Sequence, residues 1–179
     1  MNVIRRLSCK RKIVAGALLV LMAVNMSAIF FFSSEDATSS SDRSNQIADK
    51  VVDVGEQQIR PSDKPPMIKE EKKNWASKIQ YVVRESAHFL EFFPLGLLGC
   101  ALFLTVRMKW WMSAALSAAW GLLYAVSDEI HQFYVPGRSC SFQDMAIDFL
   151  GVSCGVLLML IVALAILPWY NQRRKRTCN

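Results

Sequence analysis

The sequence predicts an all-α membrane protein, a four-transmembrane-helix bundle with an extracytoplasmic loop containing short helices. Its 179 residues are 53% hydrophobic, with a mean hydropathy of +0.22. The apolar residues gather in four long blocks and do not alternate as they would in a soluble protein. A helix needs about 20 residues to cross a bilayer, so each block is expected to form one span.

These blocks divide the chain into four spans and the segments that join them. We expect a cytoplasmic basic N-terminus (1–12), a first span (13–32), an extracytoplasmic loop (33–84), a second span (85–106), a cytoplasmic link (107–111), a third span (112–133), an outer turn (134–143), a fourth span (144–168) and a cytoplasmic basic tail (169–179).

The first span has the order of basic and apolar residues that a cleaved signal peptide also has. The apolar core of a signal peptide is usually only about 7 to 15 residues long and ends at a small-residue site. Here three phenylalanines carry the apolar run past Ser27 and Ala28. A retained span is therefore predicted.

The extracytoplasmic loop is the one long polar segment. Ile47, Val51 and Val54 fall at helical spacing, which predicts a short amphipathic helix. This helix rests either on the membrane surface or on the protein's own outer face, and the sequence leaves both open. The proline-rich run 60–66 predicts a break, after which Asn74 is expected to cap a helix that continues into the second span.

Span length draws ionisable residues into the membrane. The strictly apolar part of the third block, 112–126, is only fifteen residues long, so its helix must continue to about His131 to cross. The second span likewise takes in His88 and Glu91, and the fourth takes in Asp148. Charged groups at membrane depth are costly and are functional candidates by default.

The charge of the connecting segments predicts the orientation. The N-terminal segment carries five basic residues, the link carries Arg107 and Lys109, and the tail carries four more, whereas none of the three holds an acidic residue. By the positive-inside rule both termini are cytoplasmic, and the loop and the outer turn face outward. The net charge of +6 does not indicate nucleic-acid binding, because the basic residues flank apolar runs and do not interleave with exposed aromatics.

Polar residues of the second and third spans fall on single helical faces. On the second span they are spaced i, i+4, i+7, with Glu85 rotated about 100° away. On the third span they are spaced i, i+3, i+4. The two sets are Arg84, His88 and Glu91, and Asp128, His131 and Gln132.

The outer turn and the fourth span add to this group. Arg138 lies on the turn, and Ser141 followed three residues later by Asp144 resembles a capping box. Asp144 and Asp148 then continue a stripe of small residues, Gly151 and a second glycine four residues on, that would let helices approach closely. Three helices thus aim polar groups at one outward pocket.

Charge balance within this pocket is uneven. Six acids lie against two arginines and two histidines, so two negative charges are in excess even with both histidines charged. We expect some acids to be protonated, exposed, or matched by a bound cation or cationic group. A single such residue commonly caps a helix, pairs or snorkels, but convergence from three helices favours a site. The acids are Glu85, Glu91, Asp128, Glu129, Asp144 and Asp148.

Two motifs resemble those of the VanZ-like family, small four-span membrane proteins named for a component of glycopeptide resistance gene clusters. They are Arg-x-x-x-His-x-x-Glu from Arg84 to Glu91, and Asp-Glu-x-x-Gln-x-x-x-Pro-Gly-Arg-x-x-x-x-x-Asp from Asp128 to Asp144. The resemblance covers all four spans and includes the Ser33, Ser34 pair. It implies a bacterial cell membrane location and an effect on sensitivity to teicoplanin, a lipid-tailed glycopeptide.

Two classes of function fit these residues. The first is a binding or envelope-modifying protein whose pocket engages a membrane lipid or a lipid-tailed glycopeptide, with arginines on phosphate or carboxylate and acids on an amine. The second is a membrane-embedded enzyme acting on a lipid-linked envelope substrate, with His88 or His131 as base and Glu91 or Asp128 as orienter or acid. The candidate ligand-binding residues are Arg84, Glu129, Gln132, Arg138, Asp144 and Asp148.

No metal or cofactor is predicted. No strong zinc motif is present, and the five cysteines lack CxxC spacing. A proton-coupled transporter fits less well, because four spans without internal repeats leave little room for alternating access unless a homo-oligomer forms. The side chains that could supply metal ligands are His88, Glu91, Asp128, His131 and Asp148.

Overall fold

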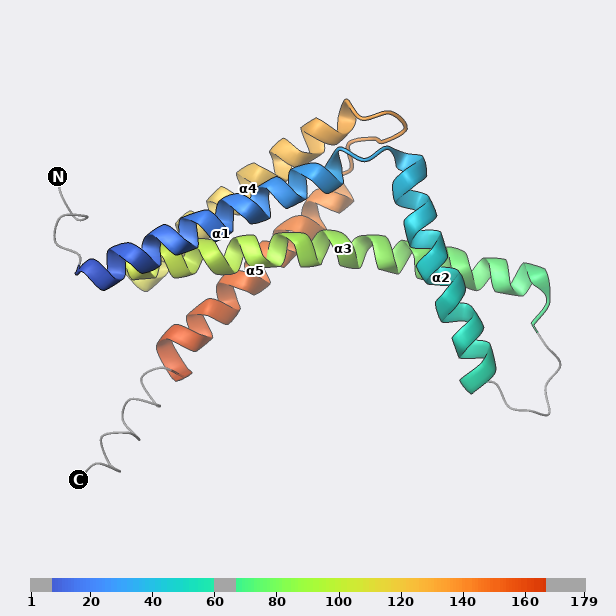
Figure 1. Ribbon diagram of the computed structural model, residues 1–179, viewed down its shortest axis with the longest axis horizontal. Helices are drawn as coiled ribbons and strands as arrows, with labels where there is room; N and C mark the ends of the chain where they lie inside the picture. Colours follow the sequence, from blue (N-terminus) through green and yellow to red (C-terminus); the bar gives the residue numbers. More distant parts are fainter. Residues whose placement is uncertain (1–7, 60–66, 167–179) are drawn as a thin grey trace, which may run out of the picture.

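The computed structural model describes residues 8–59 and 67–166. Within these ranges the chain forms five α-helices, one π-helical turn and no strand, so the predicted all-α fold is confirmed (Figure 1). The elements are α1 (Cys9–Ser33), α2 (Ala37–Ile59), α3 (Lys69–Thr105), α4 (Trp110–Phe133), α5 (Phe142–Ile161) and η2 (Val162–Ile166).

Three helical segments are long and apolar enough to cross a membrane: Cys9–Ser33, Lys69–Thr105 and Phe142–Ala165. By the length and composition of these helices, the chain is an integral membrane protein. The 24 residues of α4 give it the length of a span. Serine, tryptophan and acidic residues interrupt its apolar sequence, so its crossing, and with it the four-span bundle, stays a prediction.

Helix α3 is the central element and packs against each of the other four α-helices. In Figure 1, α1, α3 and α4 run along the long axis of the molecule, and α5 passes obliquely across α3. Helix α2 turns away from α1 and crosses the amino-terminal part of α3. The buried apolar core lies where these helices meet, and its members are Ile29, Phe92, Leu95, Cys100, Ala125, Val152 and Val156.

The contact between α3 and α5 depends on small residues. A Cβ atom added at Gly151 would lie 2.5 Å from the backbone oxygen of Phe89, and one added at Gly155 would meet the backbone oxygen of Phe93. The predicted small-residue stripe therefore lies at this contact, where the two backbones touch. Large apolar side chains such as Val20 and Leu123 instead point outward, as expected for a surface that faces lipid.

Helix α2 is the amphipathic helix expected in the loop, but at 23 residues it is longer than predicted. Its start is stabilised by Asp36, whose Oδ1 accepts hydrogen bonds from the backbone N–H of Ser39 and the hydroxyl of Thr38. These hydrogen bonds hold the pKa of Asp36 below its usual value. Ala48 and Val52 are buried, whereas the predicted apolar positions of the other face, Ile47, Val51 and Val54, are exposed.

The expected start of the next helix was wrong. Helix α3 begins at Lys69, and Asn74 lies inside it. Glu70 and Glu71 occupy the first turn, where carboxylates interact favourably with the positive end of the helix dipole. The predicted break at 60–66 lies outside the described residues.

The turn between α4 and α5 has features that the sequence predicts. Helix α4 ends at Phe133, and Gly137 has a φ of 76°, which a side chain would oppose. Ser141 is the N-cap of α5, and its Oγ accepts a hydrogen bond from the backbone N–H of Asp144 at 3.3 Å. The predicted cap at Ser141 is confirmed.

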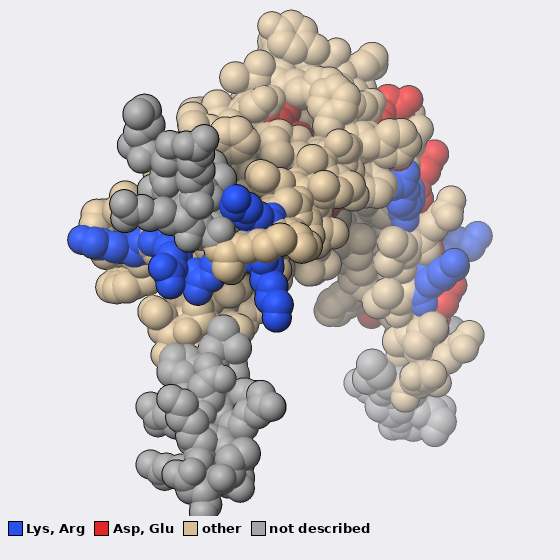
Figure 2. All heavy atoms as spheres, turned by 60° about the vertical axis from the view of Figure 1, so that its left-hand side comes forward, with Lys and Arg blue, Asp and Glu red and all other residues tan. Residues whose placement is uncertain are grey.

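The two ends of the bundle differ in charge. Lys10, Arg11 and Lys12 open α1, and Arg107 and Lys109 lie between α3 and α4 at the same end of the molecule. Figure 2 shows basic side chains grouped on this side, apart from the acidic ones. The α4–α5 turn and the start of α2 lie at the opposite end (Figure 1).

Candidate functional site

The candidate site lies at that opposite end, where α1, α3, α4 and α5 converge beside the start of α2. Eleven polar or charged residues are buried in the described chain, and seven of them gather here. They are Ser33, His88, Asp128, Glu129, Gln132, Asp144 and Asp148.

Asp128 is held by neighbours on two helices. Its Oδ2 accepts a hydrogen bond from the hydroxyl of Ser33 at 2.7 Å and from the Gln132 amide at 2.8 Å. The same amide lies 3.2 Å from the Ser33 hydroxyl. Asp128 and Gln132 share a face of α4, so this network joins the end of α1 to the end of α4.

His88 and Asp148 form a close pair between α3 and α5. The Nδ1 atom of His88 lies 3.3 Å from Oδ1 of Asp148. Apart from this contact, neither carboxylate oxygen of Asp148 has a hydrogen-bond partner among the described residues. Asp148 is fully buried, and His88 is the one group of opposite charge that pairs with it in the described chain.

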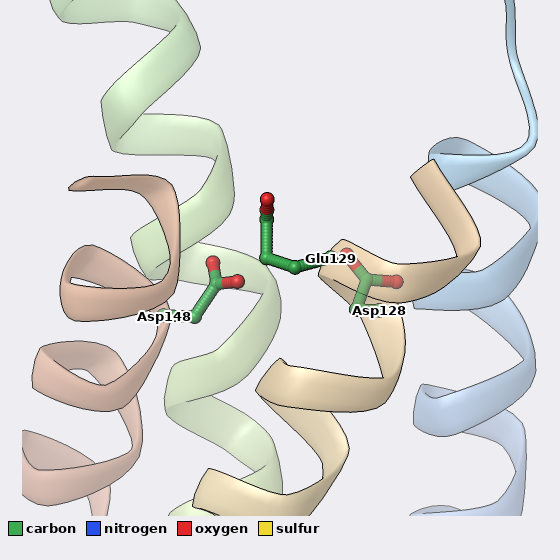
Figure 3. A group of neighbouring side chains, drawn as sticks. All are labelled: Asp128, Glu129 and Asp148. Atoms are coloured by element: carbon green, nitrogen blue, oxygen red, sulfur yellow. The ribbon is translucent and has the colours of Figure 1, made fainter. Parts of the chain in front are cut away.

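Glu129 lies on the α5 side of α4. The backbone N–H of Ser141 donates a hydrogen bond of 2.7 Å to its Oε2. One oxygen from each of Asp128, Glu129 and Asp148 lies within 4.8 Å of the others. In Figure 3 the Glu129 carboxylate stands between those of Asp128 and Asp148.

Arg84 pairs with acids at the edge of the site. It lies 3.1 Å from Asp144 and 3.9 Å from Glu85. Asp144 thus lies in the first turn of α5, where its backbone N–H binds the capping Ser141, and its carboxylate pairs with Arg84. Glu85, expected to point away from the pocket face, is nevertheless buried, because α3 is surrounded by helices at this level.

Two small adjoining cavities open beside these groups. They have volumes of ≈ 120 Å³ and ≈ 180 Å³, and Arg84, His88 and Arg138 line both. Glu91 lines the first, together with Ser33 and α2 residues. Gln132 and Asp144 line the second.

His131 is not part of these cavities. Its Nε2 lies 3.1 Å from the Ser34 hydroxyl, and its ring stacks on Phe30 with 4.5 Å between ring centroids. It therefore packs against the end of α1. The structure does not bring the two histidines together, and of the two only His88 shares a cavity with the arginines.

Sequence reasoning assigned no site role to Ser33 or to α2. Ser33 binds Asp128 directly, and Ser40 of α2 lines both cavities. Arg43, also on α2, pairs with Glu35 at 2.5 Å and lines the first cavity. The serine pair that follows the apolar run of the first span was the available signal for Ser33, but nothing in the sequence placed α2 over the site.

The arrangement is that of a helical membrane protein with a buried acidic group at one end of its bundle and two arginines at its edge. A family model described as VanZ/LLP1 matches residues 18–163. The chain belongs to this family, and the resemblance of its motifs is confirmed. No curated protein and no solved structure matches the chain.

Proposed function

We propose that the chain is a four-span protein of the bacterial cell membrane that binds the anionic head group of an envelope lipid at its outer face. The observation that carries this proposal is that Arg84 and Arg138, from different elements, line the same two cavities. Guanidinium groups bind phosphate and carboxylate oxygens with paired hydrogen bonds.

The sizes of the cavities favour a head group over a larger ligand. Pockets for drug-sized molecules usually measure about 300–1,000 Å³, whereas these hold ≈ 120 Å³ and ≈ 180 Å³. A phosphate with a small alcohol or amine fits that volume, and acids such as Glu91 would meet the amine. A glycopeptide core does not fit, so an effect on teicoplanin would come through lipids or through its acyl tail.

The outward orientation rests on the distribution of basic residues. Lys10, Arg11, Lys12, Arg107 and Lys109 lie at the end opposite the cavities. The positive-inside rule places that end, and both termini, in the cytoplasm. Helix α4 then crosses as the third span, and the cavities open at the outer leaflet.

Lipid binding to the purified chain tests the proposal. Native mass spectrometry would compare phosphatidylglycerol with diacylglycerol of the same acyl chains, which lacks the phosphate. We expect retention of the phospholipid alone, and about tenfold weaker binding in Arg84→Gln or Arg138→Gln, because a hydrogen bond to a charged group contributes about 1.5–3 kcal/mol.

Lys109→Gln is the matched control, since it removes one positive charge at the other end of the bundle. It should leave binding unchanged. Equal retention of diacylglycerol, or arginine variants that bind like the wild type, would contradict the proposal. In cells, Arg138→Gln should change sensitivity to teicoplanin more than to vancomycin, which has no lipid tail.

The second candidate is a membrane-embedded enzyme acting on a lipid-linked substrate. The close pair of His88 and Asp148 favours it, because a carboxylate beside an imidazole is the usual means of orienting a general base. Release of a labelled head group from envelope lipids would support this candidate if His88→Ala abolishes it. Retention of the lipid without release favours binding alone.

A further inference from the structure

Three buried carboxylates lie together, and in the described residues the one ion pair that any of them forms is the contact of Asp148 with His88. Asp148 and Glu129 are 0% exposed and Asp128 is 5% exposed, and one oxygen of each lies within 4.8 Å of the other two (Figure 3). No lysine or arginine of the described chain forms an ion pair with any of them. An isolated buried carboxylate is strongly disfavoured, so three together need protons or a cation.

Hydrogen bonds satisfy only part of this cluster. Asp128 receives two, from Ser33 and Gln132, and Glu129 receives one from the Ser141 backbone. Oε1 of Glu129 and both carboxylate oxygens of Asp148 have no hydrogen-bond partner among the described residues. Of these three oxygens, only Oδ1 of Asp148 has a possible donor nearby in the described chain, Nδ1 of His88 at 3.3 Å.

His88 provides a separate indication of what the cluster binds. Its side chain is 10% exposed, and its Nδ1 atom also has no hydrogen-bond partner within the described part of the chain. That nitrogen points at Asp148, 3.3 Å from Oδ1. In the tautomer that carries the proton on Nε2, this nitrogen has a free lone pair, and a neutral imidazole is a common metal ligand.

The three carboxylates are close enough together to bind one metal ion. His88 lies outside their 4.8 Å group but 3.3 Å from Asp148, so its ring would move toward the ion on binding. Two ligands at right angles on bonds of about 2.0–2.2 Å lie about 3 Å apart, close to the separation of His88 and Asp148. Ligands on opposite sides of a hard cation lie about 4–5 Å apart, which matches the limit for the three carboxylates.

We propose that three carboxylates and one imidazole, from α3, α4 and α5, form a binding site for a single divalent metal ion. They are Asp128, Glu129, Asp148 and His88. The set is mostly oxygen with one nitrogen, which suits Mn²⁺ or a cation of similar preference. The bound ion offsets two of the three negative charges and ties α3, α4 and α5 together beneath the cavities. The sequence already offered His88, Asp128 and Asp148 as possible metal ligands. It did not indicate that Glu129 joins them, because the four side chains come from three separate helices.

Binding of Mn²⁺ to the purified, chelator-treated chain tests the site. Free Mn²⁺ has a sharp electron paramagnetic resonance signal that is lost on binding, so titration gives the number of ions bound. We expect one ion per chain, and binding weakened by tenfold or more in Asp148→Asn and Glu129→Gln, which keep side-chain shape but remove a charged ligand. Pulsed electron paramagnetic resonance should show coupling between the bound Mn²⁺ and a nitrogen nucleus, and this coupling should disappear in His88→Gln.

Glu85→Gln is the matched control, because it removes another buried acid outside the cluster. It should bind Mn²⁺ like the wild type. A wild-type chain that binds no Mn²⁺ would overturn the proposal in favour of protonated acids. Binding that survives both cluster variants, or that lacks nitrogen coupling, would place the ion elsewhere and overturn it too. Lipid binding is measured in a separate experiment with the arginine variants. The metal-site proposal and the proposed function can therefore be contradicted independently of each other.

Discussion

Asp144 and Asp148 are one helical turn apart on α5, but their surroundings differ. Asp144 faces the edge of the site, where Arg84 lies 3.1 Å away and Ser141 caps the helix beside it. Asp148 is fully buried, and His88 is its one close charged neighbour of opposite sign. A residue's depth in the bundle therefore decides whether its carboxylate stabilises a helix end or is enclosed between helices.

Ser33 provides a prediction at the residue scale. Ser33→Ala removes a hydrogen bond to the buried Asp128 and one neighbour of Gln132. Leaving a buried polar group without its partner costs about 1–3 kcal/mol. Unfolding of the purified chain by titration with a denaturing detergent should show a loss of this size.

Ser27→Ala is the control on the same helix. The Ser27 hydroxyl is exposed and binds only the backbone oxygen of Ala23 in its own helix. Its removal should change the free energy of unfolding by less than about 0.5 kcal/mol. Equal effects of the two substitutions would show that the hydrogen bond from Ser33 to Asp128 does not stabilise the fold.

Helical spacing predicted some of the residues that share the candidate site, but not all of them. Arg84, His88 and Glu91 were predicted to share one face of α3, and all three line the first cavity. Asp128 and His131 were also expected to act together, but His131 turns toward Ser34 and Phe30. Helical spacing gives the direction of a side chain, whereas the neighbouring helix decides what it meets. The functional roles of these residues stay predictions.

At the scale of elements, the contact between α3 and α5 positions His88 opposite Asp148. Glycines permit this contact, because their lack of a side chain lets the two backbones touch. Helix α2 contributes differently, by crossing the amino-terminal part of α3 and closing one side of the first cavity. The site is thus built from packing between helices that are far apart in sequence.

Gly151 provides the prediction at this scale. Gly151→Ala would bring a Cβ to 2.5 Å from the Phe89 backbone oxygen, so α5 must move away from α3. Such overpacking typically costs about 1–3 kcal/mol. Detergent unfolding should show this loss, and the separation of His88 and Asp148 should increase.

Gly16→Ala is its control, because a Cβ there meets nothing within 4 Å. Alanine is a better helix former than glycine by up to about 1 kcal/mol, so this variant should be unchanged or slightly more stable. If both variants behaved alike, close packing at Gly151 would not be needed.

At the scale of the whole molecule, charge separates the two ends of the bundle. The basic residues at the start of α1 and between α3 and α4 lie at one end (Figures 1 and 2). The buried acidic cluster lies where the helices converge at the other end. This distribution would orient the protein in a membrane and place the cavities outside.

The cysteines allow a direct test of this orientation. Cys9 and Cys140 are exposed and lie at opposite ends of the bundle, whereas Cys100 is buried. In variants that keep a single cysteine, a membrane-impermeant maleimide should label Cys140 in intact cells. It should label Cys9 only after the membrane is opened, and Cys100 in neither case. Labelling of Cys9 in intact cells would reverse the proposed orientation.

The sequence by itself determined the helical class, the family and the cap at Ser141, because these depend on local composition, spacing and hydrogen bonding. It also indicated that acids would outnumber bases where the helices converge. Only the tertiary structure decided which acids meet, because the grouping of Asp128, Glu129 and Asp148 beside His88 depends on how closely α3, α4 and α5 pack. Backbone contact at a few glycines sets that distance, and no local pattern specifies it.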